Sequence, residues 1–95
     1  STSAPEQWLE AFTRENLNET NIENMLSSEI FSEFQCWCGM NNIKYDTTAL
    51  KFAVNPKNLK IDGLEKGIHK KNGATKSFNI IKLKEHFNLG CIVEL

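Results

Sequence analysis

The chain has 95 residues, of which 40% are hydrophobic and 24% charged, with 11 basic and 12 acidic side chains. This length allows one domain, and the composition is typical of a folded globular protein rather than a disordered one. No apolar run approaches the roughly 20 residues that span a bilayer, and no secretory signal is apparent. We therefore expect an intracellular protein, cytoplasmic or nuclear, without a membrane partner. Because the chain opens on Ser-Thr-Ser-Ala without an initiator Met, we also expect an excised domain.

The odd number of cysteines argues against a disulfide framework. Cys36 and Cys38 flank a tryptophan in a predicted helix, so their side chains diverge around the helix axis. Together with His69 and His86 they formally supply four zinc ligands, but Cys-x-Cys spacing on a helix suits zinc poorly. We expect buried free thiols, no metal and no other cofactor.

The two halves of the chain differ in charge. Seven glutamates and one arginine give residues 1–43 a net charge of −6, whereas ten lysines and four acidic residues give residues 44–88 a net charge of +6. Such asymmetry is typical of nucleic-acid or membrane contact, because lysines near phosphates release condensed counterions. A solvated surface, or electrostatic pairing between the two halves, explains the same lysines.

The first half predicts two helices. Ser3 as a cap, with proline and glutamate in the first turn, predicts a helix over residues 5–16. Residues 16–24 are rich in Asn, Glu and Thr, which indicates a polar connector. Ser27 or Ser28 then caps a second helix that continues to about Asn41. Its apolar residues recur at helical spacing and indicate core rather than a base-stacking platform: Ile30, Phe31, Phe34, Trp37 and Cys38.

The second half predicts two short helices and a hairpin. Residues 48–54 and 56–61 are separated by Asn55-Pro56, which is typical of a helix-turn-helix. Strands over residues 64–70 and 76–80 follow, joined by an Asn-Gly turn. Residues 81–87 predict a closing helix, and residues 91–93 an edge strand or a packed tail.

This order predicts an α+β, mainly α, fold: a winged helix-turn-helix with an extra amino-terminal helix. We expect one domain over residues 1–95, with an amino-terminal helix and connector (residues 1–26) and a winged-helix core (residues 27–95). The alternative is a mostly helical bundle in which residues 64–80 form loops.

Several short segments resemble the carboxy-terminal region of the satellite-phage and poxvirus type primase–helicases, which are superfamily-three replication proteins. They are residues 5–9 (PEQWL), residues 30–42 (IFSEFQCWCGMNN, with Trp37-Cys38 the most specific pair), residues 67–71 (GIHKK), residues 78–80 (FNI) and Leu83. The resemblance implies a module of a viral, phage or mobile-element replication protein that binds DNA or helps to assemble the parent helicase hexamer. The chain lacks a Gly-rich phosphate loop with Lys-Ser/Thr and lacks an acidic pair after a predicted strand, so we expect neither ATPase nor primase chemistry.

The candidate DNA contacts lie on the fourth predicted helix and on the hairpin. Lysines hold phosphates as point charges, and asparagine pairs with an adenine edge in the major groove. The residues are Lys57, Asn58 and Lys60 on the helix, and Lys66, His69, Lys70, Lys71 and Lys76 on the hairpin. Aromatic residues do not alternate with these lysines, which favours duplex or fork DNA over single strands.

Other functions have weaker support. Cys91 with His86 or His69 is the only candidate nucleophile–base pair, and no nucleophile turn surrounds it, so we expect no catalysis. One alternative is a protein-interaction winged helix that uses the acidic half, with Trp8 and Phe12 exposed, for oligomer assembly or for docking a replication partner. Another is a dimeric repressor that binds a palindromic site.

Overall fold

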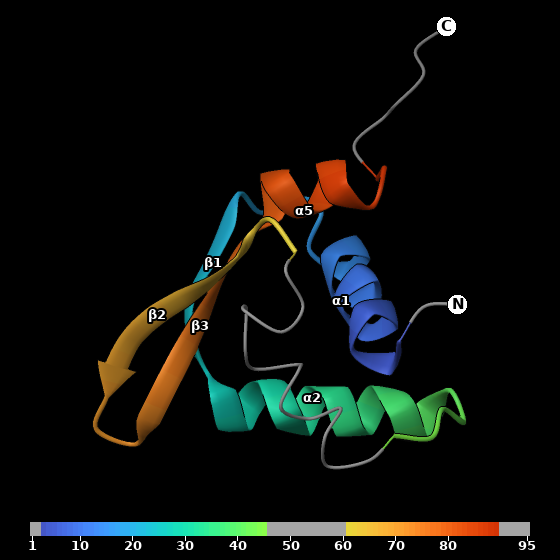
Figure 1. Ribbon diagram of the computed structural model, residues 1–95, viewed down its shortest axis with the longest axis horizontal. Coiled ribbons are helices and arrows are strands. Elements are labelled where there is room, and N and C mark those ends of the chain that lie inside the picture. The colour runs from blue at the N-terminus through green and yellow to red at the C-terminus, as the bar shows by residue number, and fades with distance from the viewer. Residues whose placement is uncertain (1–2, 46–60, 90–95) are drawn as a thin grey trace, which may run out of the picture.

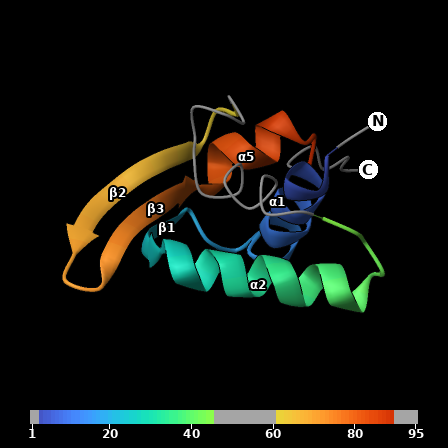
Figure 2. The ribbon, with the colours of Figure 1, turned by 60° about the horizontal axis from the view of Figure 1, so that its bottom comes forward.

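The computed structural model describes residues 3–45 and 61–89. Its elements are helix α1 (Ala4–Glu15), strand β1 (Asn21–Leu26), helix α2 (Ser27–Met40), strands β2 (Leu64–Lys70) and β3 (Gly73–Asn79), and helix α5 (Ile80–His86). The strands form an antiparallel sheet in the order β1-β3-β2. Figures 1 and 2 show α1 and α2 to one side of this sheet and the β2–β3 hairpin reaching past the first turn of α2. The fold is α+β, as predicted, and the alternative of a helical bundle with loops at residues 64–80 is wrong.

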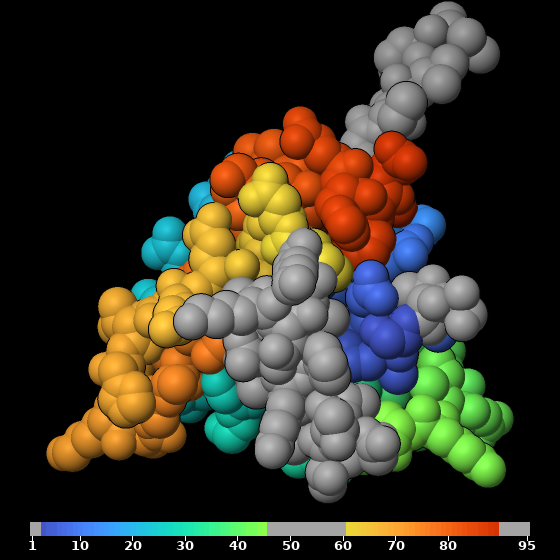
Figure 3. Space-filling model, viewed as in Figure 1, coloured from blue at the N-terminus to red at the C-terminus, as the bar shows by residue number. Residues whose placement is uncertain are grey.

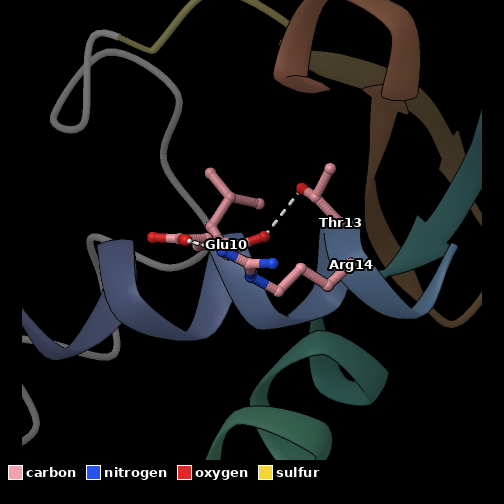
Figure 4. Close-up of polar contacts among 4 residues, drawn as sticks. Glu10, Thr13 and Arg14 are labelled. Carbon is pink, nitrogen blue, oxygen red and sulfur yellow. Dashed lines mark hydrogen bonds and ion pairs between the residues drawn. The ribbon is translucent and has the colours of Figure 1, made fainter. Parts of the chain in front are cut away.

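Helix α1 begins where the capping residues predict. Ser3 Oγ accepts a hydrogen bond from the backbone nitrogen of Glu6 at 3.4 Å, and proline lies in the first turn. Thr13 is buried without cost because its hydroxyl donates to the backbone oxygen of Leu9 at 2.8 Å. On the outer face, Arg14 pairs with Glu10 at 3.0 Å (Figure 4).

The predicted polar connector is partly wrong, because residues 21–26 form β1. The pairing with β3 shifts between Ile22 and Met25, which lie opposite Phe78 and Lys76 respectively. Because of this bulge, Ile22 and Met25 lie on the same face of the sheet although they are three positions apart in the sequence. The apolar residues of β1 therefore do not alternate in the sequence, and the strand signal is lost.

Helix α2 spans almost the predicted residues, but its cap differs. The N-cap is Leu26, the last residue of β1, rather than Ser27 or Ser28. The carboxylate of Glu29 accepts a hydrogen bond from the Leu26 backbone nitrogen at 3.2 Å. The strand thus passes into the helix without a connector, and a side chain from the first turn takes over the capping role.

The core lies between the helices and the inner face of β3. Phe78, fully buried, contacts Phe12 at a ring distance of 4.7 Å and Trp8 at 6.4 Å, and Trp8 meets Phe34 of α2 edge-on at 6.3 Å. The expectation that Trp8 and Phe12 are exposed is therefore wrong. Other core residues are Leu9, Ile30, Cys38, Ile61, Leu64, Ile80 and Leu83. Phe34 and Cys38 confirm that the aromatic stripe of α2 is core.

The hairpin and the closing helix differ from the prediction only at their ends. Lys71 and Asn72 form the predicted turn, and Gly73, with φ of 135°, begins β3 three residues earlier than expected. The strand ends at Asn79, whose side chain accepts from the backbone nitrogen of Lys82 at 3.1 Å and so caps α5. The predicted helices over residues 48–54 and 56–61, and the segment 91–93, lie outside the described residues.

Candidate nucleic-acid interface

The β2–β3 hairpin brings four of the predicted contact residues together. Lys66, His69 and Lys70 are exposed on β2, and Lys71 is exposed in the turn. Figure 3 shows the hairpin as a prominence at one corner of the molecule. No acidic residue occurs in the sequence between Lys66 and Lys84, so the tip carries cations alone.

These cations are distributed over both faces of the hairpin. Lys66 lies opposite Lys76, and His69 lies opposite Ala74. Lys66 and His69 therefore lie on the same face of the sheet as Phe78, which is buried further along β3. Lys70 lies opposite Gly73, on the other face. The hairpin therefore gathers positive charge at one end of the molecule, but not on a single face.

Lys76 does not have the expected exposure. It is 8% exposed, because it precedes Phe78 by two residues and so shares the inner face of β3. Burial, and then the charge of Lys66 across the ladder, lowers the pKa of its ammonium group. Its Nζ donates only a long hydrogen bond, 3.5 Å, to the backbone oxygen of Thr75. Lys76 is thus poorly placed to reach a phosphate.

A bulge sets the shape of the hairpin. The β2–β3 register shifts between Lys66 and His69, around Gly67. A Cβ on Gly67 would lie 2.2 Å from Thr75 Oγ1 and 2.7 Å from Asn24 Oδ1, so only glycine fits. Asn24 Oδ1 accepts from the backbone nitrogen of Ile68 at 3.0 Å, and the Thr75 hydroxyl donates to the Ile68 backbone oxygen. These contacts, which the sequence did not reveal, fix the direction of the tip.

The hairpin cations have no acidic partner among residues 3–45 and 61–89. The ion pairs in that part of the chain are Arg14–Glu10 and Lys82–Asp62, the latter at 3.7 Å. Exposed ammonium groups without a carboxylate nearby are available to an anionic ligand, and their attraction is screened by salt.

The other predicted site residues are resolved only in part. Lys57, Asn58 and Lys60 lie outside the described residues, as does Cys91. The expectation of buried thiols is wrong for Cys36, which is exposed, and confirmed for Cys38, whose burial raises the pKa of its thiol. In the described ranges, no group of three or more His, Cys, Asp or Glu side chains is arranged to hold a metal ion.

No protein-family model, curated protein or solved structure matches this chain. None of the described helices has the length and apolar character needed to cross a membrane. The geometry and charge of the hairpin are therefore the features that indicate a function.

Proposed function

We propose that this chain is a DNA-binding winged-helix domain and that the β2–β3 hairpin is the wing that contacts the phosphate backbone. A helix-turn-helix followed by a basic hairpin is the winged-helix arrangement, and the predicted helix-turn-helix lies outside the described residues. Here β1 joins the hairpin to the helical half by pairing with β3, on the side away from β2. The wing is thereby held at a fixed angle to α2, which follows β1 directly.

One observation carries the proposal: the exposed cations of the tip have no carboxylate partner in the described part of the chain. Lys66, Lys70 and Lys71 are long side chains on a protruding element, present on both of its faces. A wing that lies along a groove meets phosphates of both strands, so charge on two faces suits it better than charge on one. Lysine–phosphate contacts give affinity through counterion release and carry little sequence information.

The resemblance to primase–helicases supports a place for this domain in a replication protein of a virus, phage or mobile element. There it would hold duplex or fork DNA while a separate ATPase unit supplies the chemistry. This chain would act as a non-catalytic module, with no cofactor of its own. Its partners would be DNA and other replication proteins, including the parent hexamer.

Fluorescence polarisation of a labelled duplex, titrated at several salt concentrations, tests the proposal. We expect the affinity to fall steeply as the salt concentration rises. The double variant Lys70→Ala/Lys71→Ala should lower the slope of log affinity against log salt concentration by about two units. The matched control, Lys44→Ala/Lys82→Ala, removes the same charge from exposed positions on other elements and should retain the slope.

Binding that is absent, or independent of salt, would overturn the proposal, as would equal losses in the two double variants. A forked substrate and a single strand of the same sequence, measured in parallel, show which form the domain prefers.

A further inference from the structure

A hollow lies between α1 and α2, on the acidic half of the molecule. Its volume is about 210 Å³. Trp8 and Phe12 of α1 contribute to its buried floor, whereas Met40 at the end of α2 is 80% exposed. We call this the acidic groove, lined by Trp8, Ala11, Phe12, Glu15, Glu33, Cys36, Trp37 and Met40.

Two carboxylates, one from each helix, give the groove its negative charge. Burial, followed by the charges of Glu15 and Glu29, raises the pKa of Glu33. Neither Glu15 nor Glu33 takes part in an ion pair with residues 3–45 or 61–89. Arg14 of α1 pairs instead with Glu10 at 3.0 Å. An apolar floor with uncompensated carboxylates at its rim suits a segment that carries both cations and an apolar side chain.

The β2–β3 hairpin is such a segment. Ile68 is 59% exposed at the bulge, and Lys70 and Lys71 follow it after one intervening residue, His69. In Figures 1 and 2 the hairpin tip and α1 lie at opposite ends of the molecule, so a chain cannot place its tip in its own groove. Both complementary surfaces are therefore available on one copy at the same time.

We infer that the acidic groove receives the β2–β3 hairpin of a second copy of this chain, with Ile68 on the apolar floor and Lys70 and Lys71 beside Glu15 and Glu33. Because the two surfaces differ, each contact joins the hairpin of one copy to the groove of another, either reciprocally about a two-fold axis or head-to-tail in a chain or ring. A hairpin tip buries little area, so the association is weak and salt-sensitive. DNA on the same hairpin competes with it.

Sedimentation equilibrium over a concentration series reaching the order of 100 μM, where weak interfaces become populated, tests the inference. We expect the average mass to rise with concentration at low salt and to return to the monomer value at high salt. The groove reversal Glu15→Lys/Glu33→Lys and the hairpin reversal Lys70→Glu/Lys71→Glu should each remain monomeric. An equimolar mixture of the two should associate again, because each groove then meets a hairpin of opposite charge.

A control of equal net charge is Glu19→Lys/Glu85→Lys, at exposed positions outside the groove, which should associate like the wild type. If the groove reversal does not fold, Met40→Glu tests the same surface, because this exposed side chain contributes little to the core. We expect it to weaken association at least several-fold. Persistent association of both reversals, or failure of the mixture to associate, would overturn the inference.

The same variants separate this inference from the proposed function, on which it does not depend. The groove reversal should lose self-association and keep DNA binding. If wild-type chains associate but no DNA binds, the proposed function fails and the groove contact remains. If DNA binds and no variant affects the mass, the groove contact fails alone.

Discussion

Asn24 in β1 hydrogen-bonds to Ile68 in β2 across the intervening strand, with 3.0 Å between its side-chain oxygen and the backbone nitrogen of Ile68. The two residues belong to strands that are not neighbours in the sheet, because β3 separates them. Asn24 has φ of 57°, a left-handed conformation that asparagine tolerates better than most residues. Asn24 lies in the bulge of β1 and Ile68 in the bulge of β2, and these two irregularities allow the Asn24 side chain to reach the backbone of Ile68.

Replacing Asn24 with glycine isolates the contribution of this contact. Glycine accepts the positive φ, so Asn24→Gly removes the side-chain oxygen without adding backbone strain. We expect a loss of about 1–2 kcal/mol in the free energy of unfolding, since a partly buried hydrogen-bond network is broken. Urea unfolding measures the loss, and amide hydrogen exchange at Ile68 should accelerate. Unchanged exchange at Ile68 would mean that the contact is not maintained in solution.

Gly67 and Gly39 should respond in opposite ways to the same substitution. Gly67→Ala places a methyl group 2.2 Å from Thr75 Oγ1, and should cost about 1–3 kcal/mol of stability. Gly39 lies in α2 with nothing within 4 Å of its would-be Cβ, so Gly39→Ala should stabilise by about 0.5 kcal/mol. Thermal unfolding of the two variants gives the comparison, and a Gly67→Ala variant as stable as the wild type would contradict the bulge geometry.

Replacing Lys76 with methionine should stabilise the protein. The Lys76 ammonium is buried, and its pKa is lowered by burial and by Lys66, so the charged group destabilises the folded state at neutral pH. Lys76→Met should therefore raise the free energy of unfolding by about 1 kcal/mol. Because the unfolded chain binds the proton more tightly, the stability of the wild type should rise as the pH approaches 10.5, and the variant should lack this rise.

The same variant tests the role of Lys76 in DNA binding. The Lys76 ammonium group is poorly placed to reach a phosphate, so Lys76→Met should leave the slope of log affinity against log salt concentration unchanged, whereas Lys71→Met should lower it by about one unit. A reduced slope for Lys76→Met would indicate that the side chain turns outward on binding.

Glu33→Gln should give a small gain in stability at neutral pH. The folded-state pKa of Glu33 is raised, so the folded chain binds the proton more tightly and wild-type stability from this group increases as the pH falls through that pKa. Because the side chain is exposed and screened, the gain at neutral pH should be only a few tenths of a kcal/mol. Urea unfolding at neutral pH and below pH 4.5 measures it, and the difference between variant and wild type should vanish at the lower pH.

The sequence predicted the elements with strong local signals. Ser3 fixed the start of α1, the aromatic spacing fixed α2, and the Asn-Gly turn fixed the hairpin. Strand β1 was not predicted, because a bulge breaks the alternation of its polar and apolar residues and because an Asn-rich sequence normally indicates a loop.

The sequence predicted site residues correctly only where the exposure of a side chain follows from its place in a turn or beside one. Lys70 and Lys71 flank the turn, and turns are exposed. The burial of Lys76 follows from its spacing to Phe78, a signal that was present in the sequence and was outweighed by the charge pattern. The bond from Asn24 to Ile68 joins positions 44 residues apart, which no local pattern reveals.

The continuity of β1 with α2 has a consequence for how the chain can be divided. Residues 3–26 supply one edge of the sheet and three core side chains, Trp8, Leu9 and Phe12. A fragment that starts at residue 27 would lose the side chains of α1 that pack on Phe78 and would leave the hairpin as an isolated two-stranded sheet, so we expect it to aggregate or remain unfolded. The position of the hairpin therefore depends on contacts with the first quarter of the polypeptide, which are distant in sequence, and the hairpin should be among the last parts to acquire protection during refolding.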